Sequence, residues 1–325
     1  MTAVVTGAGG FVGGNLVRAL LDDGQDVRAG VFQGPGGLEG LDVNLVQLDV
    51  LDEDSLVAAF TGADVVYHCA AAISIMGGQG GRVESINIQG TKNVVEACLK
   101  AEVGRLVHFS SVHALNPLPA DEEIDEDRAL ATDDHFPAYT RSKAGGEMAV
   151  LAGVERGLDA VILNPSGIIG PYDFKPSLLG QTLMQLYNRS LPALVDGAYD
   201  FVDVRDVVQS AIVASTRGAS GQRYLLSGHY SSVQDLALTA ESASGKRAPR
   251  MVTPLWVARW TAPLFEGFSA LTGTRPLYTR ESVQVLADNA HFNISRARET
   301  LGHDPRPLKE TMVDTYAWLE ESGML

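Results

Sequence analysis

The feature that most constrains the fold is a glycine cluster near the start of the chain. Gly7, Gly10 and Gly13 follow the spacing G-x-x-G-x-x-G directly after the apolar run Ala3–Val5. Gly7 permits a tight turn, Gly10 lets the backbone approach a pyrophosphate, and Gly13 allows close contact between helix and sheet. The phosphate would lie against the positive end of a helix that begins near Phe11. A strand, glycine loop and helix in this order predict a dinucleotide-binding site.

Short apolar runs alternate with amphipathic runs through the first half of the chain. The apolar runs predict strands at Ala3–Val5, Asp26–Phe32, Asn44–Leu48, Asp64–Cys69, Arg105–Phe109 and Asp159–Leu163. Their nearly continuous apolar character indicates burial on both faces, as in a parallel sheet. The amphipathic runs predict helices at Phe11–Asp22, Asp52–Phe60, Val83–Lys100 and Tyr139–Glu155. This alternation predicts an α/β fold with a doubly wound parallel sheet of the Rossmann type.

The second half is less regular and predicts a smaller, mainly helical lobe. Pro165–Pro176 is rich in glycine and proline and is expected to be a loop. Helices are expected at Leu178–Tyr187, Val204–Ser215 and Val233–Ser244, with several more in Pro254–Leu325. We expect residues 1–165 and 196–228 to form the dinucleotide-binding domain, and residues 166–195 and 229–325 to form a substrate-binding lobe.

Composition limits the classes of partner. The net charge is −15 and no stretch rich in lysine or arginine interrupts it, so nucleic acid would be repelled. Cys69 and Cys98 lie in apolar or helical runs, and two buried free thiols suit a reducing cytosol. The first apolar segment runs into the glycine loop, which argues against a secretory signal. The longest apolar stretch, Pro254–Leu271, contains an arginine, a proline and a glutamate, which disfavours a membrane span. We expect a soluble, cytoplasmic protein.

Two further patterns carry candidate chemistry. Tyr139 and Lys143 are four residues apart in a predicted helix, so the phenol and the ammonium can point into one cleft. A nearby ammonium would lower the pKa of Tyr139 towards neutral pH, which suits an acid/base catalyst. Ser110 and Ser111 directly follow the strand Arg105–Phe109, and catalytic side chains in open α/β sheets come from such strand ends. Ser111 is the better candidate for binding a carbonyl or carbinol oxygen, whereas Ser110 is expected to cap a turn.

These residues together resemble the extended short-chain dehydrogenase/reductase superfamily over nearly the whole chain. The motifs that carry the resemblance are Thr6-Gly7-Ala8-Gly9-Gly10-Phe11-Val12-Gly13, Cys69-Ala70-Ala71-Ala72, Asn87-Ile88-Gln89-Gly90-Thr91, Phe109-Ser110-Ser111, Tyr139-x-x-x-Lys143, Asn164-Pro165-Ser166-Gly167-Ile168-Ile169-Gly170-Pro171 and Phe201-Val202-Asp203-Val204-Arg205-Asp206. The Asn-Pro-Ser run is most similar to dihydroflavonol reductases and 3β-hydroxysteroid dehydrogenases, whereas sugar-nucleotide epimerases usually have Leu-Arg-Pro there.

The resemblance implies roles for individual residues. Ser111 matches the catalytic serine, Tyr139 the acid/base, and Lys143 the lysine that also holds the nicotinamide ribose. Asp49 matches a residue that contacts the adenine. The residues expected along the cofactor are Gly7, Gly9, Gly10, Phe11, Val12, Gly13, Phe32, Asp49, Val50, Ala70, Ala71, Ala72, Tyr139, Lys143, Asn164, Pro165, Ser166 and Ile168. Ser74, His113 and Tyr199 are candidates for the substrate pocket.

The end of the second strand bears on the choice between NAD and NADP. Dihydroflavonol reductases have an arginine there that reads the 2′-phosphate of NADP, whereas this chain has Val31-Phe32-Gln33. No acid for the NAD ribose is present either. Because a 2′-phosphate carries full charge, the missing arginine matters more, and the sequence favours NAD.

Other polar residues have plainer interpretations. His113 could line the substrate cleft, but a structural histidine is at least as expected. Asp203 and Asp206 are not joined by a cluster of His or Glu, so no metal is expected, and Asp203 is interpreted as a helix N-cap. The acidic run Asp121–Asp127 is interpreted as a solvated loop.

The expected function is oxidoreduction between a secondary alcohol and a ketone, with Tyr139 exchanging the proton. A sugar-nucleotide epimerase or dehydratase would use the same residues without net redox change. A non-enzymatic dinucleotide sensor would have no need of an activated phenol. The resemblance also implies a homodimer built through the helices Val83–Lys100 and Tyr139–Glu155.

The substrate is approached only indirectly. Nucleotide-sugar enzymes of this superfamily usually place an arginine where this chain has Tyr199 and another where it has Asn164, and a buried diphosphate needs cations. Among the cations of the second lobe, we expect few beyond Arg275 and Arg280 to be placed for this role. An apolar run there comprises Leu255, Trp256, Val257, Trp260, Leu264, Phe265, Phe268 and Leu271. It is interpreted as a core-facing helix, or as one wall of a pocket for an uncharged, lipophilic alcohol or ketone.

Overall fold

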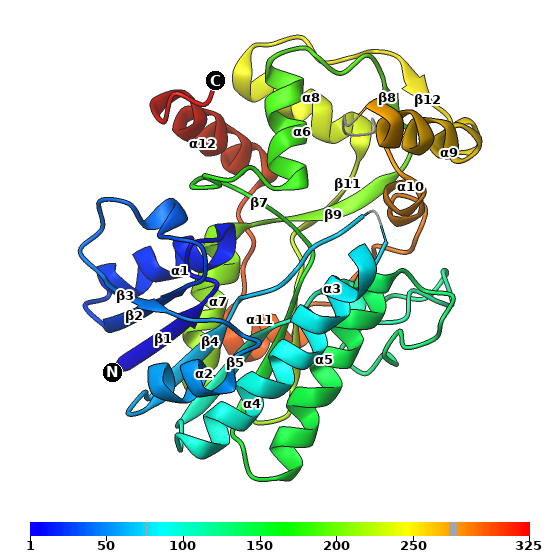
Figure 1. Cartoon of the computed structure of the whole chain (residues 1–325). Coiled ribbons are helices and arrows are strands. Elements are labelled where there is room, and N and C mark those ends of the chain that lie inside the picture. Colours follow the sequence, from blue (N-terminus) through cyan, green and yellow to red (C-terminus); the bar gives the residue numbers. More distant parts are fainter. Residues whose placement is uncertain (76, 273–277) are drawn as a thin grey trace.

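The computed structural model describes residues 1–75, 77–272 and 278–325, apart from the side chains of residues 268–272. Figure 1 shows an α/β body that contains the N-terminus and a lobe above it that contains the C-terminus. The longer helices are α1 (Phe11–Asp22), α2 (Glu53–Phe60), α5 (Ala138–Glu155), α6 (Leu178–Tyr187), α7 (Val204–Arg217), α8 (Val233–Ser244), α9 (Leu255–Thr272), α10 (Arg280–Val285), α11 (Ser295–Leu301) and α12 (Leu308–Glu321).

A seven-stranded sheet forms the centre of the body, with the strand order β10-β6-β5-β4-β1-β2-β3. Every pairing in it is parallel. The strands are β1 (Thr2–Thr6), β2 (Asp26–Val31), β3 (Asn44–Gln47), β4 (Val65–His68), β5 (Arg105–Phe109), β6 (Ala160–Pro165) and β10 (Arg223–Leu226). The chain order reverses between β1 and β4, which is the switch point where ligands bind in such sheets. The predicted doubly wound fold is confirmed.

Two hydrophobic cores lie on opposite faces of this sheet. Val5 of β1 belongs to the core that contains Leu16 of α1 and Val207 of α7. Its neighbour Val4 belongs to the other core, with Leu56 of α2. Successive strand side chains point to opposite faces, so a strand covered on both faces needs an uninterrupted apolar run.

Short strands in the second half differ from the prediction. The strands β7 (Gly167–Ile169), β9 (Ala198–Asp203) and β11 (His229–Ser232) form a three-stranded sheet, and β8 (Leu194–Val195) pairs with β12 (Val252–Thr253). The prediction that Pro165–Pro176 is entirely a loop is wrong, because β6 runs to Pro165 and β7 follows it. Except for β9, these strands have two to four residues and are too short for a period of two to stand out in the sequence. β9 has six residues, but its buried positions include Asp200 and Asp203, which interrupt the apolar run.

The predicted helix Val83–Lys100 is divided into three parts. A short helix α3 (Arg82–Glu84) leads into a π-helical turn (Ser85–Gln89) and then into α4 (Gly90–Lys100). Such π turns occur often at functional sites. Here the turn carries Asn87, whose side chain is buried.

The acidic run Asp121–Asp127 is not the fully solvated loop that the sequence predicts. Ile124 is 2% exposed and forms an isolated bridge with Phe292, while Glu126 is buried and accepts a hydrogen bond from the backbone of Leu225. The run therefore carries two inward-facing residues among its exposed acids.

The lobe has its own core, formed mainly by α6, α8, α12 and β9. Helix α11 contacts α7 and β10 instead, so it packs on the body although it belongs to the C-terminal segment. No helix among the described residues is long and apolar enough to cross a membrane.

Candidate active site

The glycine loop between β1 and α1 leaves room for a ligand at one position. Gly7 has a φ of +66°, and a Cβ on it would lie 2.8 Å from the backbone of Ala70. A Cβ on Gly13 would collide with the carbonyl oxygen of Gly7. Gly10, the N-cap of α1, is different, because a Cβ there would meet only the Gly7 carbonyl oxygen, at 3.2 Å. Protein packing therefore requires glycine at positions 7 and 13, and the space beside Gly10 is open.

The start of α1 suits a phosphate. The N–H groups of Phe11 and Val12 have no acceptor within the helix, and no acidic residue lies in its first turn. The helix dipole adds positive potential there. Gly9 lies under the loop after β2, since a Cβ on it would come within 3.0 Å of the carbonyl oxygen of Pro35. This arrangement fits the pyrophosphate of a dinucleotide.

The segment after β4 is held beside the glycine loop. The backbone N–H of Ala70 donates to the Thr6 hydroxyl at 3.2 Å. The Asn87 amide makes two hydrogen bonds with the backbone of Ala72, accepting from its N–H at 2.8 Å and donating to its carbonyl at 2.9 Å. Between them, Ala71 is exposed. The π turn thus fixes the strand end that the sequence places along the cofactor.

The structure brings Ser111, Tyr139 and Lys143 together. The Ser111 side chain lies next to the Tyr139 phenol, whose pKa it lowers. Lys143 lies one turn along α5 from Tyr139, and its Nζ donates to the carbonyl oxygen of Phe109 at 2.8 Å. Ser111 also caps the 3-10 helix Val112–Ala114 by accepting from the backbone N–H of His113.

The predicted capping role of Ser110 is wrong. Its hydroxyl oxygen is buried and has no hydrogen-bond partner among the described residues, whereas Ser111 caps the turn. The two serines lie at the very end of an extended strand, where successive side chains point to opposite sides. Only one of them can therefore face the turn and Tyr139.

The predicted lowering of the Tyr139 pKa by Lys143 is also wrong. Burial raises the pKa of Tyr139 to about 12, and the neighbouring Ser111 hydroxyl opposes this only in part. Burial lowers the pKa of Lys143 to about 8, although the nearby Glu147 carboxylate partly opposes this shift. The ammonium faces a backbone carbonyl rather than the phenol. Both groups are therefore protonated at neutral pH, and Tyr139 is poised to donate a proton.

A buried polar network that the sequence analysis missed supports these residues. Glu147, one turn beyond Lys143 on α5, is completely buried and forms a 2.6 Å ion pair with Arg223. The Asn164 amide nitrogen donates to Glu147 at 2.5 Å and to the carbonyl oxygen of Ser111 at 2.9 Å. Asn164 thus holds Ser111 in place. The signal in the sequence was an acid four residues after Lys143, on the same face of its helix.

A cavity lies between the body and the lobe, next to Tyr139: Thr140 and His113, which adjoin Tyr139, line it, whereas Tyr139 and Ser111 themselves do not. The His113 ring donates to or accepts from the Tyr199 hydroxyl at 2.8 Å, stacks on the Tyr199 ring and meets the Tyr139 ring edge-on. The lining residues are Val112, His113, Leu115, Pro117, Ile124, Phe136, Pro137, Thr140, Tyr199, Glu281, Gln284, Val285, Asp288, Asn289 and Phe292. None of these is lysine or arginine. Burial raises the pKa of both Glu281 and Asp288.

From the sequence, the apolar run Leu255–Leu271 is interpreted as a core-facing helix or as a pocket wall, and the residues that line this cavity correct that interpretation. The residues that face the cavity from this part of the chain come from α10 and the segment after it, not from α9. Trp256, Trp260 and Leu264 are exposed, so this face of α9 is not core-facing either. The side chains of Phe268 and Leu271, like Arg275, lie outside the described residues. Arg280 pairs with Glu266.

The remaining predicted residues lie at the strand ends. Phe32 is exposed beyond β2, and Asp49 follows β3 and accepts from the backbone N–H of Leu51. Val50 is buried against Gly90 of α4. Pro165 ends β6, and Ile168 lies within β7. These positions surround the switch point, and their contacts with a cofactor stay predictions.

Two further predicted site residues are Ser166 and Ser74. The Ser166 hydroxyl donates to buried Asp200 at 2.5 Å. Ser74 is buried between β4 and α3 and does not line the cavity beside Tyr139. Its assignment to the substrate pocket therefore lacks support from the cavity.

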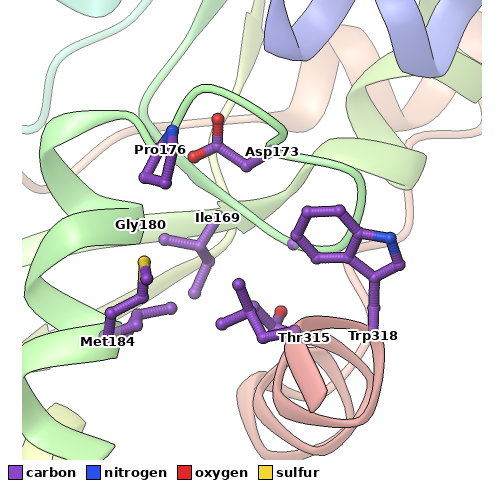
Figure 2. A pocket seen from close by; sticks show the side chains of 10 residues that line it. Ile169, Asp173, Pro176, Gly180, Met184, Thr315 and Trp318 are labelled. Carbon is purple, nitrogen blue, oxygen red and sulfur yellow. The ribbon is translucent and has the colours of Figure 1, made fainter. Parts of the chain in front are cut away.

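A second, small cavity lies in the lobe, between the loop after β7, α6 and α12. Figure 2 shows Asp173, Gly180 and Met184 on one side of it and Thr315 and Trp318 on the other. The Asp173 carboxylate accepts from the backbone of Ser177, and burial raises its pKa. None of its lining residues belongs to the group around Tyr139.

Asp203 and Cys98 follow their predicted roles, whereas Cys69 is less buried than predicted. Asp203 caps α7 by accepting from the backbone N–H of Arg205, and its carboxylate also pairs with that side chain. Asp206 pairs with Arg306 at 2.7 Å. Cys98 is buried, Cys69 is half-buried, and both are free thiols.

Comparison with known proteins matches the chain to one family. The family model for the NAD dependent epimerase/dehydratase family matches residues 3–227. The chain is 34% identical over 331 residues to sterol demethylase protein B of Methylococcus capsulatus, covering all of both chains. It is 30% identical over 327 residues to 3 beta-hydroxysteroid dehydrogenase/Delta 5-->4-isomerase of Mycobacterium tuberculosis, covering 93% of this chain and 85% of that one. The crystal structure of gox2253 superposes with a TM-score of 0.87 at 29% identity, covering 100% of this chain and 99% of that one.

Proposed function

Because the chain belongs to the NAD-dependent epimerase/dehydratase family, within the extended short-chain dehydrogenases/reductases, it is an NAD-dependent enzyme, and we propose that it interconverts a secondary alcohol and a ketone on an uncharged ring compound of the sterol class. Two relatives carry names that refer to sterols or 3β-hydroxysteroids. The resemblance to dihydroflavonol reductases and steroid dehydrogenases in the Asn164-Pro165-Ser166 run supports the same choice.

The character of the cavity beside Tyr139 carries this proposal. Its wall is built largely from apolar and aromatic side chains, among them Leu115, Phe136 and Phe292. Its charged lining groups, Glu281 and Asp288, are acids whose pKa values burial raises. A diphosphate placed there would meet carboxyl groups and no cation from the lining residues, at a high cost in free energy. A lipophilic alcohol would instead bury apolar surface.

Three residues perform the proton chemistry in this proposal. Tyr139, with its pKa raised to about 12, holds the proton that a ketone oxygen takes up on reduction. Ser111, whose side chain lies next to the Tyr139 phenol, positions that oxygen. Lys143 places a positive charge on the same helix face as Tyr139. Its hydrogen bond to the carbonyl oxygen of Phe109 fixes the position of α5 relative to the end of β5. When bound, the nicotinamide supplies or accepts the hydride.

The preferred cofactor in this proposal is NAD rather than NADP. Phe32 and Gln33, at the end of β2, are exposed and uncharged. The nearest basic residue on α1, Arg18, donates to the carbonyl oxygens of Gly14 and Gly37 and lies over the Tyr172 ring. Its guanidinium is thus already engaged, which leaves a 2′-phosphate without a ready partner.

A substrate panel tests the proposal. The purified enzyme is incubated with 3β-hydroxysterols, 3-ketosteroids and flavonoid ketones, and in parallel with UDP- and dTDP-sugars. Each substrate is paired with NAD(H) and with NADP(H), and reduced nicotinamide is followed by absorbance. We expect turnover of a sterol or steroid. Micromolar binding of a nucleotide sugar with no turnover of any ring ketone would assign the chain to the epimerase alternative, which the family name keeps open.

Three finer assignments accompany this proposal. They are a homodimer through α4 and α5, a cytoplasmic location, and a division into a dinucleotide-binding domain and a substrate lobe. The free cysteines support the cytoplasmic assignment. The division would place α11 with the dinucleotide-binding domain, because it packs on α7 and β10.

A further inference from the structure

Helix α9 exposes its largest apolar side chains. Trp256, Trp260 and Leu264 are 68%, 79% and 71% exposed, and their four-residue spacing places them on one face of the helix. The residues buried beneath them are small, Ala258 and Ala262. This is the reverse of an ordinary surface helix, which buries its large apolar residues.

The exposure is concentrated in one segment. Among the described residues, the five most exposed large apolar side chains include Trp256, Trp260, Leu264 and also Met251, which precedes the helix and is 62% exposed. Figure 1 shows α9 and the adjoining strand β12 at the periphery of the lobe. Several large apolar side chains exposed on one helix face, with another in the adjoining segment, mark an interaction surface.

The charge around this patch is opposite to that of the rest of the chain. Residues 242–265 contain Lys246, Arg247, Arg250 and Arg259 and no aspartate or glutamate, so they carry four positive charges in a chain of net charge −15. These four are spread over fourteen residues, which is why no stretch rich in basic residues stands out. Two acids from outside this segment lie near it: Glu241 of α8 pairs with Arg250 and interacts with Arg247, and Asp288 interacts with Arg259.

The patch is connected to the cavity beside Tyr139. The hydroxyls of Thr261 on α9 and Tyr278 share a hydrogen bond of 2.5 Å, and the rings of Phe265 and Tyr278 lie 5.0 Å apart. Helix α9 packs on α10, and α10 supplies Glu281 to the cavity wall. Whatever α9 contacts is therefore one helix away from the cavity.

We propose that the face formed by Met251, Trp256, Trp260 and Leu264 docks on the surface of an anionic lipid bilayer. Tryptophan favours the boundary between headgroups and acyl chains, and flanking lysine and arginine are attracted to anionic headgroups. A second copy of this chain fits the face less well. In a twofold dimer the same face meets itself, so the basic segments of the two copies would repel each other.

Docking in this way would bring α10 and the cavity close to the acyl region, where a lipophilic substrate resides. The surface proposal goes beyond the proposed function and does not require it, since it rests on the exposure and charge of α9. Its test accordingly uses lipid alone, with no substrate and no turnover.

Tryptophan fluorescence gives a direct readout. The chain has three tryptophans, and the third, Trp318, is only 8% exposed. Vesicles of phosphatidylcholine with about a third phosphatidylglycerol should shift the emission of the wild type to the blue and carry the protein in flotation. The double substitution Trp256→Ser/Trp260→Ser should weaken flotation at least tenfold and leave an emission that vesicles do not change. Leu238→Ser, which removes an exposed apolar side chain from α8, should bind as the wild type does.

A charge variant separates the electrostatic part. Arg247→Glu/Arg259→Glu should weaken binding to the anionic vesicles about tenfold and leave the weaker binding to pure phosphatidylcholine unchanged. Unchanged flotation of the tryptophan variant, or no flotation of the wild type, would overturn the proposal. A wild-type dimer that the tryptophan substitutions convert to a monomer would show that a second copy covers the face, and would overturn it as well.

Discussion

The ammonium nitrogen of Lys143 donates a 2.8 Å hydrogen bond to the carbonyl oxygen of Phe109, the last residue of β5. This contact joins the middle of α5 to the strand end from which Ser111 projects. Because Tyr139 lies one turn before Lys143, the same contact sets the position of the phenol relative to the serine hydroxyl. The three residues therefore form one unit, in which a change at Lys143 displaces the other two.

Replacing the phenol should separate catalysis from binding. Tyr139→Phe should lower turnover by several orders of magnitude and leave cofactor affinity nearly unchanged, because only the proton-transferring hydroxyl is removed. Lys143→Ala should damage both, since it also removes the anchor at Phe109. Steady-state kinetics and cofactor titration measure the two effects. Near-normal turnover of the Tyr139→Phe enzyme would rule out the proposed mechanism.

The glycine loop allows a matched pair of substitutions. Gly10→Val should abolish dinucleotide binding while the protein stays folded, because the space beside Gly10 is free of protein atoms other than the Gly7 carbonyl oxygen. Gly13→Val should instead destabilise the fold, since its side chain would collide with the Gly7 backbone. Titration with NADH, followed by fluorescence, and thermal unfolding distinguish the two. Unchanged NADH affinity in Gly10→Val would place the cofactor elsewhere.

The preference for NAD over NADP should change when one positive charge is added at the end of β2. Gln33 is exposed just beyond β2, where the 2′-phosphate of NADP would lie. Gln33→Arg should raise the affinity for NADPH about tenfold and change that for NADH little, because an arginine pairs with a phosphate but not with a ribose hydroxyl. Gln33→Met is the neutral control. A wild-type enzyme that already prefers NADPH would contradict the assignment to NAD.

Much of this site was predictable because its motifs are contiguous in sequence. The glycine loop and the Tyr139–Lys143 pair each occupy a few neighbouring residues, and both lie in strongly patterned elements. The buried strands were predictable because burial on both faces requires an unbroken apolar run. The same argument failed for β7, which has only three residues, and for β10, whose four residues begin with the charged Arg223.

The rest depends on contacts between distant parts of the chain. That Glu281 lines the cavity depends on α10 lying at the same cavity as the start of α5, which no local pattern encodes. The pKa of Tyr139 depends on how deeply α5 is buried, so a helix-face argument gave the wrong direction. The apolar run of α9 would look the same whether it faced a core, a pocket or solvent, and only the structure shows that Trp256 and Trp260 face outward.

The proposed dimer should be disrupted by a charge at one position of α5. Met148 is the most exposed large apolar side chain of α5, at 53%, and it lies on the face away from the sheet. If α5 packs against its copy across a twofold axis, Met148→Glu should place two like charges close together and convert the dimer to the 34.6 kDa monomer. Light scattering at micromolar concentration measures this. A wild type that is already monomeric would refute the dimer.

Stability should depend on pH in a direction set by Lys143. Burial lowers its pKa from 10.5 in the unfolded chain to about 8 in the folded one. Between these values the unfolded state binds more protons, so the contribution of Lys143 to the free energy of unfolding rises with pH, by up to about 3 kcal/mol. At neutral pH the buried charge of Lys143 therefore destabilises the cofactor-free protein and is kept for function.

Urea unfolding at a series of pH values measures the effect as the difference between wild type and Lys143→Met, which cancels the other titrating groups. The wild type should gain on the variant as the pH rises from about 8 to 10. A difference that stays flat over this range would show that Lys143 keeps an ordinary pKa, with Glu147 fully offsetting its burial, and would contradict the prediction.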